Sequence, residues 1–263
     1  GFYLGTARLK VEGALDGGFN YKLQTDFAES IALKDALIGY EVSPSVGVTG
    51  GRYKALFSYE ELTSSSATPF INRSRVVRAL APGRQIGTHL TGAVTPTVDL
   101  HAGVYNGNGA NLGENNNRFL YVGRLASSTE TEDGLIHLGV NGAYNDQSIL
   151  DDELLVGADV HVEHDAFLLG GEAIYGRQSF QGTVEPFTRN PFGHHLTVGY
   201  TLPSTERMNQ LLLRWDRFTR DTDQDASDQL IVGYIGKPTS VIRIEANYVL
   251  PVADGGVHQA MLE

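Results

Sequence analysis

Apolar and polar residues alternate along most of this chain, and the period of two holds for eight or nine residues at a time. In the segment near the C-terminal third, Leu211, Leu213 and Trp215 alternate with Arg214 and Asp216. Three further segments show the same alternation clearly: 18–27, 153–164 and 240–250. Successive side chains of a β-strand point to opposite faces, so this pattern predicts strands with one apolar and one polar face.

Fifteen segments have the length and the alternation of strands: 2–13, 18–27, 31–42, 45–57, 84–94, 97–107, 117–127, 134–145, 153–164, 166–178, 191–201, 207–218, 228–236, 240–250 and 256–263. Short turns such as ALDGG and SPSV tend to alternate with longer polar loops such as NGNGANLGENNN. No linker divides the chain, and no helical pattern is long enough to cover a sheet. We therefore predict an all-β chain that forms a single domain over residues 1–263.

The polar faces of these strands carry full charges. The charged positions include Arg8, Lys10, Glu12, Lys22, Asp26, Arg118, Arg124, Arg214, Asp216, Arg243 and Glu245. Strands with one lipid-like face and one wet face, joined by alternately short and long loops, are typical of a transmembrane antiparallel β-barrel. The alternative is a soluble two-sheet sandwich, which shares the alternation but has to bury its apolar faces against each other.

The composition narrows the class of protein further. No window approaches the roughly 18 apolar residues of a membrane-spanning helix, which excludes a helical membrane protein. The chain has no cysteine, so disulfides, thiolate metal sites and cysteine nucleophiles are excluded. It starts at Gly1 without a charged and then apolar leader, and we expect that any targeting peptide has been removed.

Charge is distributed unevenly. The formal net charge is −11, but residues 1–126 hold 12 Lys/Arg and 10 Asp/Glu, whereas residues 127–263 hold 8 and 21. We interpret acidic runs such as STETEDG and RDTDQDASDQ as solvated loops. In contrast, Arg73, Arg75, Arg78 and Arg84 crowd into one irregular segment between two strands.

Several stretches of the chain carry a family resemblance. ARLKVEGALDGGFNYKLQTDF, ALKDALIGYE, TGGRYKALFSYEELTSSSATPFINRS and ALAPGRQIGTHLTG resemble the phosphate-selective porin O and P family, as do VYNGNG and LLLRWDRFTRDTD. The similarity covers most of the chain and is most specific from Arg52 to Gly87. By comparison with that family, the chain begins near the expected second strand and ends in VHQAMLE rather than in an aromatic closing strand.

The resemblance implies a fold and a location. Members of the family form 16-stranded outer-membrane barrels that are typically trimeric, with a third loop that folds inward and narrows the pore. We therefore expect an inward-folded constriction loop after the strand that ends near residue 57. We also expect a bacterial outer-membrane protein that contacts lipid and lipopolysaccharide, forms a homotrimer, and needs neither nucleic acid nor a cofactor.

The predicted site is a set of six cations at this loop. Arg73, Arg75 and Arg78 lie on the loop, Arg84 lies at its exit, and Arg52 and Lys54 lie on the strand that leads into it. Cations crowded in a narrow aqueous channel raise the local concentration of anions. The alternative role is structural: Arg73 and Arg84 could pair with Glu60, Glu61 or acids of the wall and pin the loop.

Other motifs point to no additional chemistry. Adjacent residues on a strand face opposite ways, so His194 and His195 do not share an ion, and we interpret them and HVEHD at 161–165 as lumen or rim residues. The acidic segment 221–228 lacks the spacing of a calcium loop, and GNGANLG at 107–113 precedes no helix. No G-x-S-x-G is present. We expect no metal site and no enzymatic activity.

The sequence thus favours a passive outer-membrane porin for small hydrophilic solutes that prefers anions, with phosphate and other oxyanions as candidates. Two alternatives remain open at this point. One is a non-conducting β-barrel scaffold, or a surface-binding component of an outer-membrane assembly. The other is a soluble β-rich ligand-binding protein. Detergent dependence separates the soluble class from the barrels, and single-channel conductance separates a pore from a scaffold.

Overall fold

The computed structural model describes residues 3–28, 30–109, 117–146, 151–181, 185–203, 208–252 and 259–262. Two short helices are present, α1 (Tyr59–Leu62) and α2 (Arg75–Leu80). The strands are β1 (Arg8–Leu15), β2 (Phe19–Asp26), β3 (Ala32–Ser43), β4 (Val46–Lys54), β5 (Arg84–Thr95), β6 (Val98–Tyr105), β7 (Leu120–Thr131), β8 (Gly134–Asp146), β9 (Asp151–His164), β10 (Phe167–Phe180), β11 (Phe187–Arg189), β12 (Phe192–Thr201), β13 (Met208–Thr219), β14 (Ser227–Lys237), β15 (Ile244–Pro251) and β16 (Gln259–Leu262).

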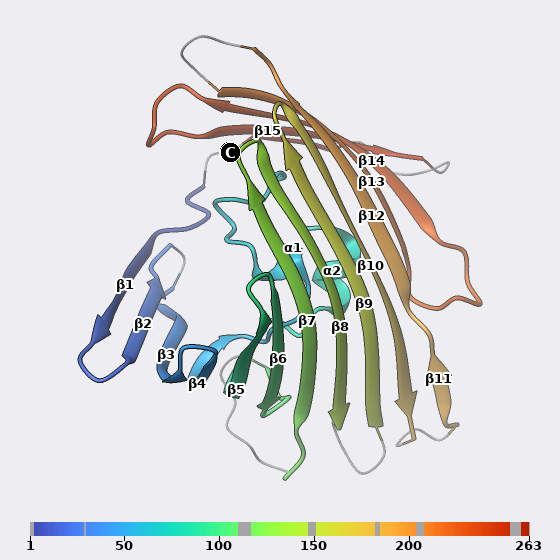
Figure 1. The fold of residues 1–263 in the computed structure, drawn as a ribbon. Coiled ribbons are helices and arrows are strands. Elements are labelled where there is room, and N and C mark those ends of the chain that lie inside the picture. The colour runs from blue at the N-terminus through green and yellow to red at the C-terminus, as the bar shows by residue number, and fades with distance from the viewer. Residues whose placement is uncertain are drawn as a thin grey trace.

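The strands form one antiparallel sheet of 16 strands in which each strand pairs with its neighbours in sequence, except that β10 pairs with β12 past the short strand β11. The path runs from β1 to β16, and the short strand β11 lies off this path and pairs with β10. Figure 1 shows the sheet curving into a barrel wall around the two helices. Each strand of the path overlaps one of the fifteen predicted segments. Residue 2 of the first segment, residue 207 of the segment 207–218, and residues 256–258 and 263 of the last segment lie outside the described part of the chain.

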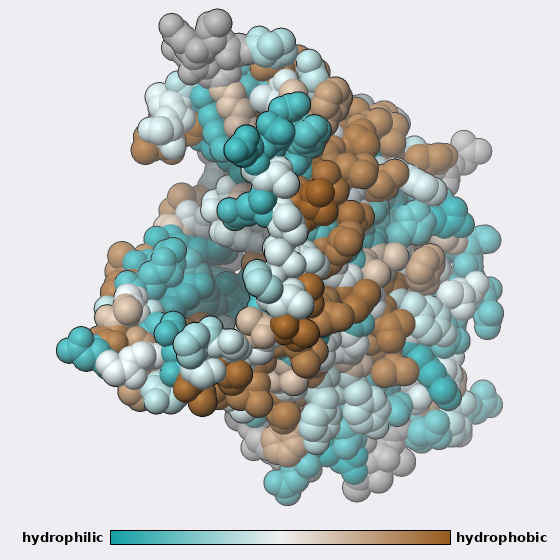
Figure 2. Space-filling model, viewed as in Figure 1, coloured by the Kyte–Doolittle hydropathy of each residue, from teal (hydrophilic) through white to brown (hydrophobic). Residues whose placement is uncertain are grey.

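The faces of the wall follow the predicted alternation. On β13, Leu211, Leu213 and Trp215 are exposed on the outside, whereas Arg214 and Asp216 are buried on the inside. Figure 2 shows hydrophobic residues in a band over the outer surface of the strands on the face in view. The outer surface is therefore apolar because every second residue of each strand is apolar, and the charged residues between them face the lumen.

Aromatic residues mark the ends of the apolar band. Phe167 and Tyr200 form a ring pair near one end, with centroids 5.0 Å apart, and Phe19 and Tyr40 form another at 4.7 Å. Tyr175, eight residues after Phe167 on β10, lies about 26 Å further along the strand at 3.3 Å per residue, which is about 20 Å of height for a strand tilted by roughly 40°. Belts of aromatic residues on either side of an apolar band are typical of membrane-spanning barrels.

The connections differ in length at the two ends of the wall. Residues 44–45, 96–97 and 132–133 make short turns at one end, whereas the connection between β4 and β5 spans residues 55–83 at the other. This long connection contains both helices. No helix in the described part of the chain is long and apolar enough to cross a membrane.

Gly51 lets the long connection start close to the wall. It pairs with Leu37 of β3 and has a φ of 133°, and a Cβ atom there would lie 2.2 Å from the carbonyl oxygen of Ala36. A residue with a side chain would clash with β3 at this position. The close approach positions the end of β4 from which the chain turns into the lumen.

Candidate functional site

The connection of residues 55–83, called the inward loop below, is held in shape by its two helix starts. Ser58 accepts a hydrogen bond on Oγ from the backbone of Glu61 at 3.0 Å, and Ser74 accepts one from Val77 at 3.4 Å. Each serine thus satisfies a backbone N–H at the first turn of a helix. Ser58 also donates from Oγ to Glu172 Oε2 on β10 at 2.9 Å, so α1 starts directly against the wall.

Apolar side chains bring the inward loop onto the inner wall. Phe57, Val76 and Val77 pack with wall residues that include Leu155 and Ile174, and all five are at most 1% exposed. A second cluster places Phe70 of the loop on Leu212, Ile231, Ile235 and Val249 of β13–β15. Full burial of a side chain of this kind contributes about 1.5–3 kcal/mol. The loop lies in the lumen because its apolar residues find apolar patches there.

Glu60 joins both helices of the loop to the wall. Its Oε1 accepts a hydrogen bond from Arg214 Nη2 of β13 at 2.5 Å, and its Oε2 accepts two from the backbone and hydroxyl of Ser74 at 2.9 and 2.7 Å. His195 Nε2 lies 3.7 Å from the same oxygen. Although burial raises the pKa of the Glu60 carboxyl, Arg214, His195 and Ser74 lower it to about 2. The carboxyl is therefore ionised and bound on both oxygens.

Arg73 and Arg75 also hold the loop. Arg73 donates to the carbonyl oxygens of Glu60 at 2.9 Å and Thr63 at 2.7 Å. Arg75 reaches the wall, where Nη2 donates to the carbonyl oxygen of Asp216 at 2.5 Å and Nη1 donates to Ser227 Oγ at 2.6 Å. Both side chains thus have structural contacts, and their contact with a permeating ion stays a prediction.

The tip of the inward loop contacts the wall near both edges of the sheet, at the residue before β15 and at β1. Arg243 donates to the carbonyl oxygens of Ser66 and Thr68, both at 2.5 Å. On the other side, Arg8 Nη1 donates to Ser65 Oγ at 2.9 Å. The loop starts and ends at β4 and β5, so these contacts extend it across the interior.

Opposite the loop, the wall of β2–β5 carries cations around a single acid. Asp35 Oδ1 accepts a hydrogen bond from Arg84 Nε at 2.7 Å, and its Oδ2 lies 2.7 Å from Lys22 Nζ. The guanidinium of Arg52 interacts electrostatically with both Asp35 and Arg84. The carboxylate of Asp35 thus interacts with three cations of the wall, Lys22, Arg52 and Arg84.

Lys54 connects this wall to the loop. Its Nζ donates to the carbonyl oxygens of Glu61 and Thr63, the latter at 3.0 Å, and it interacts electrostatically with Arg73, Arg84 and Asp35. Arg73 Nε lies 3.3 Å from Glu61 Oε2. We call Lys22, Arg52, Lys54, Arg73 and Arg84 the cation cluster. Two acids, Asp35 and Glu61, pair with members of the cluster. The five cations and the two acids together have a formal charge of +3.

The structure thus brings together four of the six predicted site residues, and both predicted pairings, Arg73 with Glu61 and Arg84 with a wall acid, are present. Arg75 and Arg78 lie elsewhere, on α2. Arg78 is exposed and lines a hollow of about 520 Å³ with Arg75 and Arg220, between α2 and the β13–β14 connection. These arginines stand at the end of the lumen where the long connections lie.

Sequence reasoning did not assign site roles to Lys22, Asp35 and Arg214. The alternation placed Lys22 and Arg214 on the wet face, but a period of two does not tell which strands face the inward loop. Asp35 was harder to recognise, because it is a single acid at an inward-facing position of β3. Its role depends on Lys22 and Arg84, which lie 13 and 49 residues away in the sequence.

The histidines behave as the strand geometry predicts. His194 contacts Trp215 on the outer face with ring centroids 4.8 Å apart, whereas His195 is buried on the inner face. Within the described ranges, no group of three or more His, Asp or Glu residues is placed to hold a metal ion. Residues 110–113 of the glycine-containing segment 107–113 lie outside those ranges.

Solved structures with the same fold include porins and an outer membrane protein. The anion-selective porin from Comamonas acidovorans matches with a TM-score of 0.70 and 12% identity, covering 93% of this chain and 78% of the porin. The trimer form of OmpT, an outer membrane protein of Vibrio cholerae, matches with a TM-score of 0.65 and 12% identity, covering 94% and 80%. A further porin matches with a TM-score of 0.61 and 10% identity, covering 97% and 89%.

An antiparallel wall with an apolar outer face, a charged inner face and an inward loop is the fold of an outer-membrane porin. The sequence agrees with this class, because the model of the family described as phosphate-selective porin O and P matches residues 1–187. The chain belongs to the phosphate-selective porin O and P family. No curated protein matches the chain in sequence. The fold class and the outer-membrane location predicted from the sequence are confirmed.

Proposed function

We propose that this porin is a passive, anion-preferring diffusion pore whose selectivity arises where the inward loop faces the wall of β2–β5. The observation that carries the proposal is the cation cluster, in which five cations surround two acids. In a narrow aqueous passage with low-dielectric walls, such an excess raises the local concentration of anions. The proposal contains no catalytic step.

The path of an anion follows from the positions of the cations. From the end with the long connections, an anion first meets Arg78 and Arg220 at the hollow beside α2. It then passes the cation cluster, where Arg52 and Arg84 supply guanidinium groups that stay charged at any working pH. Planar guanidinium groups suit oxyanions such as phosphate, because two parallel N–H groups match two oxygens.

The acids of the cation cluster also have a role in permeation. Asp35 occupies one side of Arg84 and of Lys22, so an anion that binds these cations competes with a fixed carboxylate. Conduction requires binding that is strong enough for entry and weak enough for exit. We infer that Asp35 and Glu61 keep the binding of each ion weak, so that the cluster attracts anions without trapping them.

The assembly we propose is a homotrimer of one-domain barrels over residues 1–263, set in outer-membrane lipid and lipopolysaccharide. The exposed apolar outer face supplies the surface for both lipid and subunit contact. The trimer form of OmpT, which shares the fold, supports this assembly. Mass measurement of the purified protein in mild detergent tests it, since a uniform monomer there and in native membranes contradicts the trimer.

Planar-bilayer recording of the purified protein tests the proposed function. In a gradient of potassium chloride, we expect a reversal potential with the sign of a chloride-preferring pore, and we expect added phosphate to reduce the chloride current. A reversal potential of cation-preferring sign contradicts the proposal. A correctly folded protein that inserts but does not conduct supports instead the scaffold that the sequence left open.

A further inference from the structure

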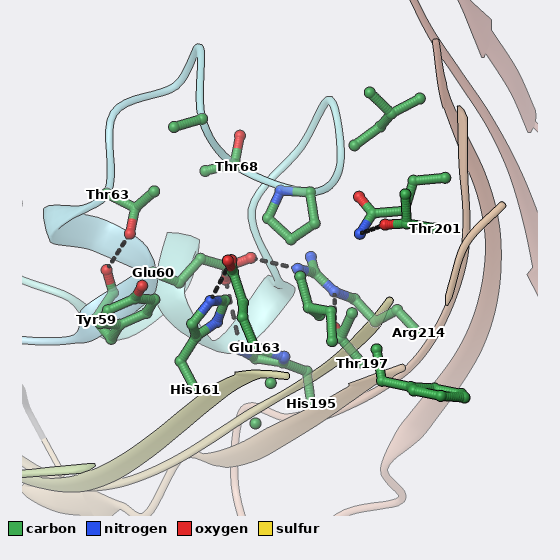
Figure 3. Close-up of a pocket in the computed structure, with 18 of the residues that line it drawn as sticks. Tyr59, Glu60, Thr63, Thr68, His161, Glu163, His195, Thr197, Thr201 and Arg214 are labelled. Carbon is green, nitrogen blue, oxygen red and sulfur yellow. Dashed lines mark hydrogen bonds and ion pairs between the residues drawn. The ribbon is translucent and has the colours of Figure 1, made fainter. Parts of the chain in front are cut away.

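The inward loop separates the cation cluster from a chamber on the opposite wall. On α1, Glu61 pairs with Arg73 of the cation cluster, whereas the adjacent Glu60 lines the chamber. The chamber lies between the loop and the inner faces of β9–β14 and has a volume of about 590 Å³ (Figure 3). This volume falls within the range of sites for small organic ligands, about 300–1,000 Å³.

The ionised groups that line this chamber are largely paired within the protein. Figure 3 shows Glu60 with Arg214 and His161 with Glu163, at 2.5 and 2.9 Å. Arg243 Nε lies 2.7 Å from Glu245. At the rim, Lys237 and Asp165 contribute one charge of each sign. The chamber therefore lacks the excess of positive charge that attracts anions to the cation cluster.

Two buried polar side chains of the chamber wall have atoms that a ligand with hydroxyl groups could bond. Glu172 and His195 are direct cross-strand partners on β10 and β12, and they are 4% and 7% exposed. Within the described residues, Glu172 Oε1 and both ring nitrogens of His195 have no hydrogen-bond partner. Leaving such groups unpaired is costly, and one hydroxyl can both donate to a carboxylate and bond to an imidazole nitrogen.

The rest of the chamber offers apolar contact and neutral hydrogen-bonding groups. Leu168, Met208 and Ile235 supply apolar surface, and Gln210 supplies an amide whose Nε2 donates weakly to Thr201 at 3.4 Å. Gly170 on the inner face of β10 also lines the chamber, and its lack of a side chain leaves space there for a ligand. Apolar surface with a few convergent neutral polar groups suits a ring with one apolar face and hydroxyl groups at its edge.

We propose that this chamber binds a small uncharged solute with several hydroxyl groups, of mono- or disaccharide size. The apolar face of the solute lies on Leu168 and Met208. Its hydroxyl groups bond to Gln210 and to the Glu172–His195 pair. The site goes beyond the anion pathway, because it occupies the other side of the inward loop and uses no member of the cation cluster.

Titration calorimetry with cellobiose tests the chamber. The purified porin is kept in a detergent without sugar groups, so that the detergent does not compete for the site. We expect saturable binding in the native chain that phosphate does not displace. The Gly170→Leu variant should bind about tenfold more weakly or worse, because the leucine occupies the space that the solute needs.

The structure supplies a matched control and a second variant. A Cβ at Gly170 would lie 3.6 Å from His161 Nδ1 and 3.9 Å from Thr197 Cβ, so the backbone accepts the change. Gly142→Leu makes the same substitution on the outer face of β8, where a Cβ meets open space, and it should bind normally. If Gly170→Leu fails to fold, Gln210→Leu removes the amide at similar bulk and should also weaken binding.

The result also separates this site from the anion pathway. Binding is measured without ion flow, and Gly170→Leu should leave the reversal potential of the pore unchanged. Failure of anion preference therefore leaves the chamber intact as a proposal. The absence of saturable binding in the native chain, or equal binding by Gly170→Leu and Gly142→Leu, overturns it.

Discussion

Glu60 of the inward loop and Arg214 of the barrel wall form an ion pair 2.5 Å long that is almost completely buried, with side-chain exposures of 6% and 1%. The two residues are 154 positions apart in the sequence. Arg214 also lies over the ring of Phe70 at 4.3 Å and donates to Thr197 at 3.1 Å. The pair thus fixes the loop that shapes the pore.

Replacing Glu60 by glutamine should release the loop. The change leaves the guanidinium of Arg214 buried without its carboxylate, and breaking a buried pair in this way costs about 3–5 kcal/mol. We expect a larger single-channel conductance and faster proteolysis within the inward loop, residues 55–83. Glu163→Gln is the control, because that side chain is 55% exposed. An unchanged conductance for Glu60→Gln would show that the apolar clusters hold the loop without the pair.

The two arginines of α2 should respond differently to substitution. Arg75→Gln removes the bonds to Asp216 and Ser227, and hydrogen bonds of a charged group contribute about 1.5–3 kcal/mol each. We expect this variant to raise conductance by loosening the loop. Arg78→Gln should leave the conductance unchanged and lower the anion preference slightly, since the side chain of Arg78 is exposed at the hollow beside α2. Planar-bilayer recordings measure both the conductance and the anion preference of the two variants. Identical values for Arg75→Gln and Arg78→Gln would contradict the different roles assigned to the two arginines.

The orientation of the wall makes a prediction about folding. Val140 is 54% exposed near the middle of β8, on the face assigned to lipid. Val140→Arg should lower the free energy of unfolding in lipid vesicles by about 2–4 kcal/mol. Gln24→Arg on the inner face of β2, away from the turn at residues 16–18, is the matched change and should cost far less. Equal costs would mean that the two faces are wrongly assigned.

The attachment of the loop should withstand mild acid. The pKa of Glu60 is lowered from 4.5 to about 2, so its stabilising effect is complete above pH 4.5 and is lost as the pH falls through 2. We expect constant loop protection against proteolysis from pH 8 to about 5, and loosening between about 4.5 and 2. Glu60→Gln should lack this acid transition. A Glu60-dependent transition above pH 5 would contradict the pairing with Arg214.

The alternation of residues was sufficient to predict the wall, because lipid and water impose opposite demands on the two faces of every strand. Leu211, Leu213 and Trp215 show this on β13. The ion pairs inside the lumen were beyond such reasoning. Asp159 illustrates the limit: it stands on the wet face, yet Arg124 Nη1 binds it at 2.6 Å and only 1% of its side chain is exposed. Which wet-face residues are buried depends on where the inward loop lies.

The roles of the predicted cations could also be predicted only in part from the sequence. The sequence predicted that arginines gather at one loop, and it left open whether they contact ions or pin the loop. Arg73 and Arg75 bond to backbone carbonyls, which no side-chain pattern reveals. Lys22 joins the site only because β2, β3 and β5 converge on Asp35.

We propose that the cation cluster sets the ion preference of the pore, and the reversal potential of a triple variant is the decisive measurement. Lys22, Arg52 and Arg84 are replaced together by glutamine, which keeps the tethers of the inward loop, and Arg189→Gln serves as a control outside the cluster. Asp35→Asn is the opposite change, because it removes an acid from the same site. In a potassium chloride gradient, the triple variant should shift the reversal potential toward cations, Asp35→Asn toward anions, and the control not at all. An unchanged reversal potential in a folded, conducting triple variant would contradict the account.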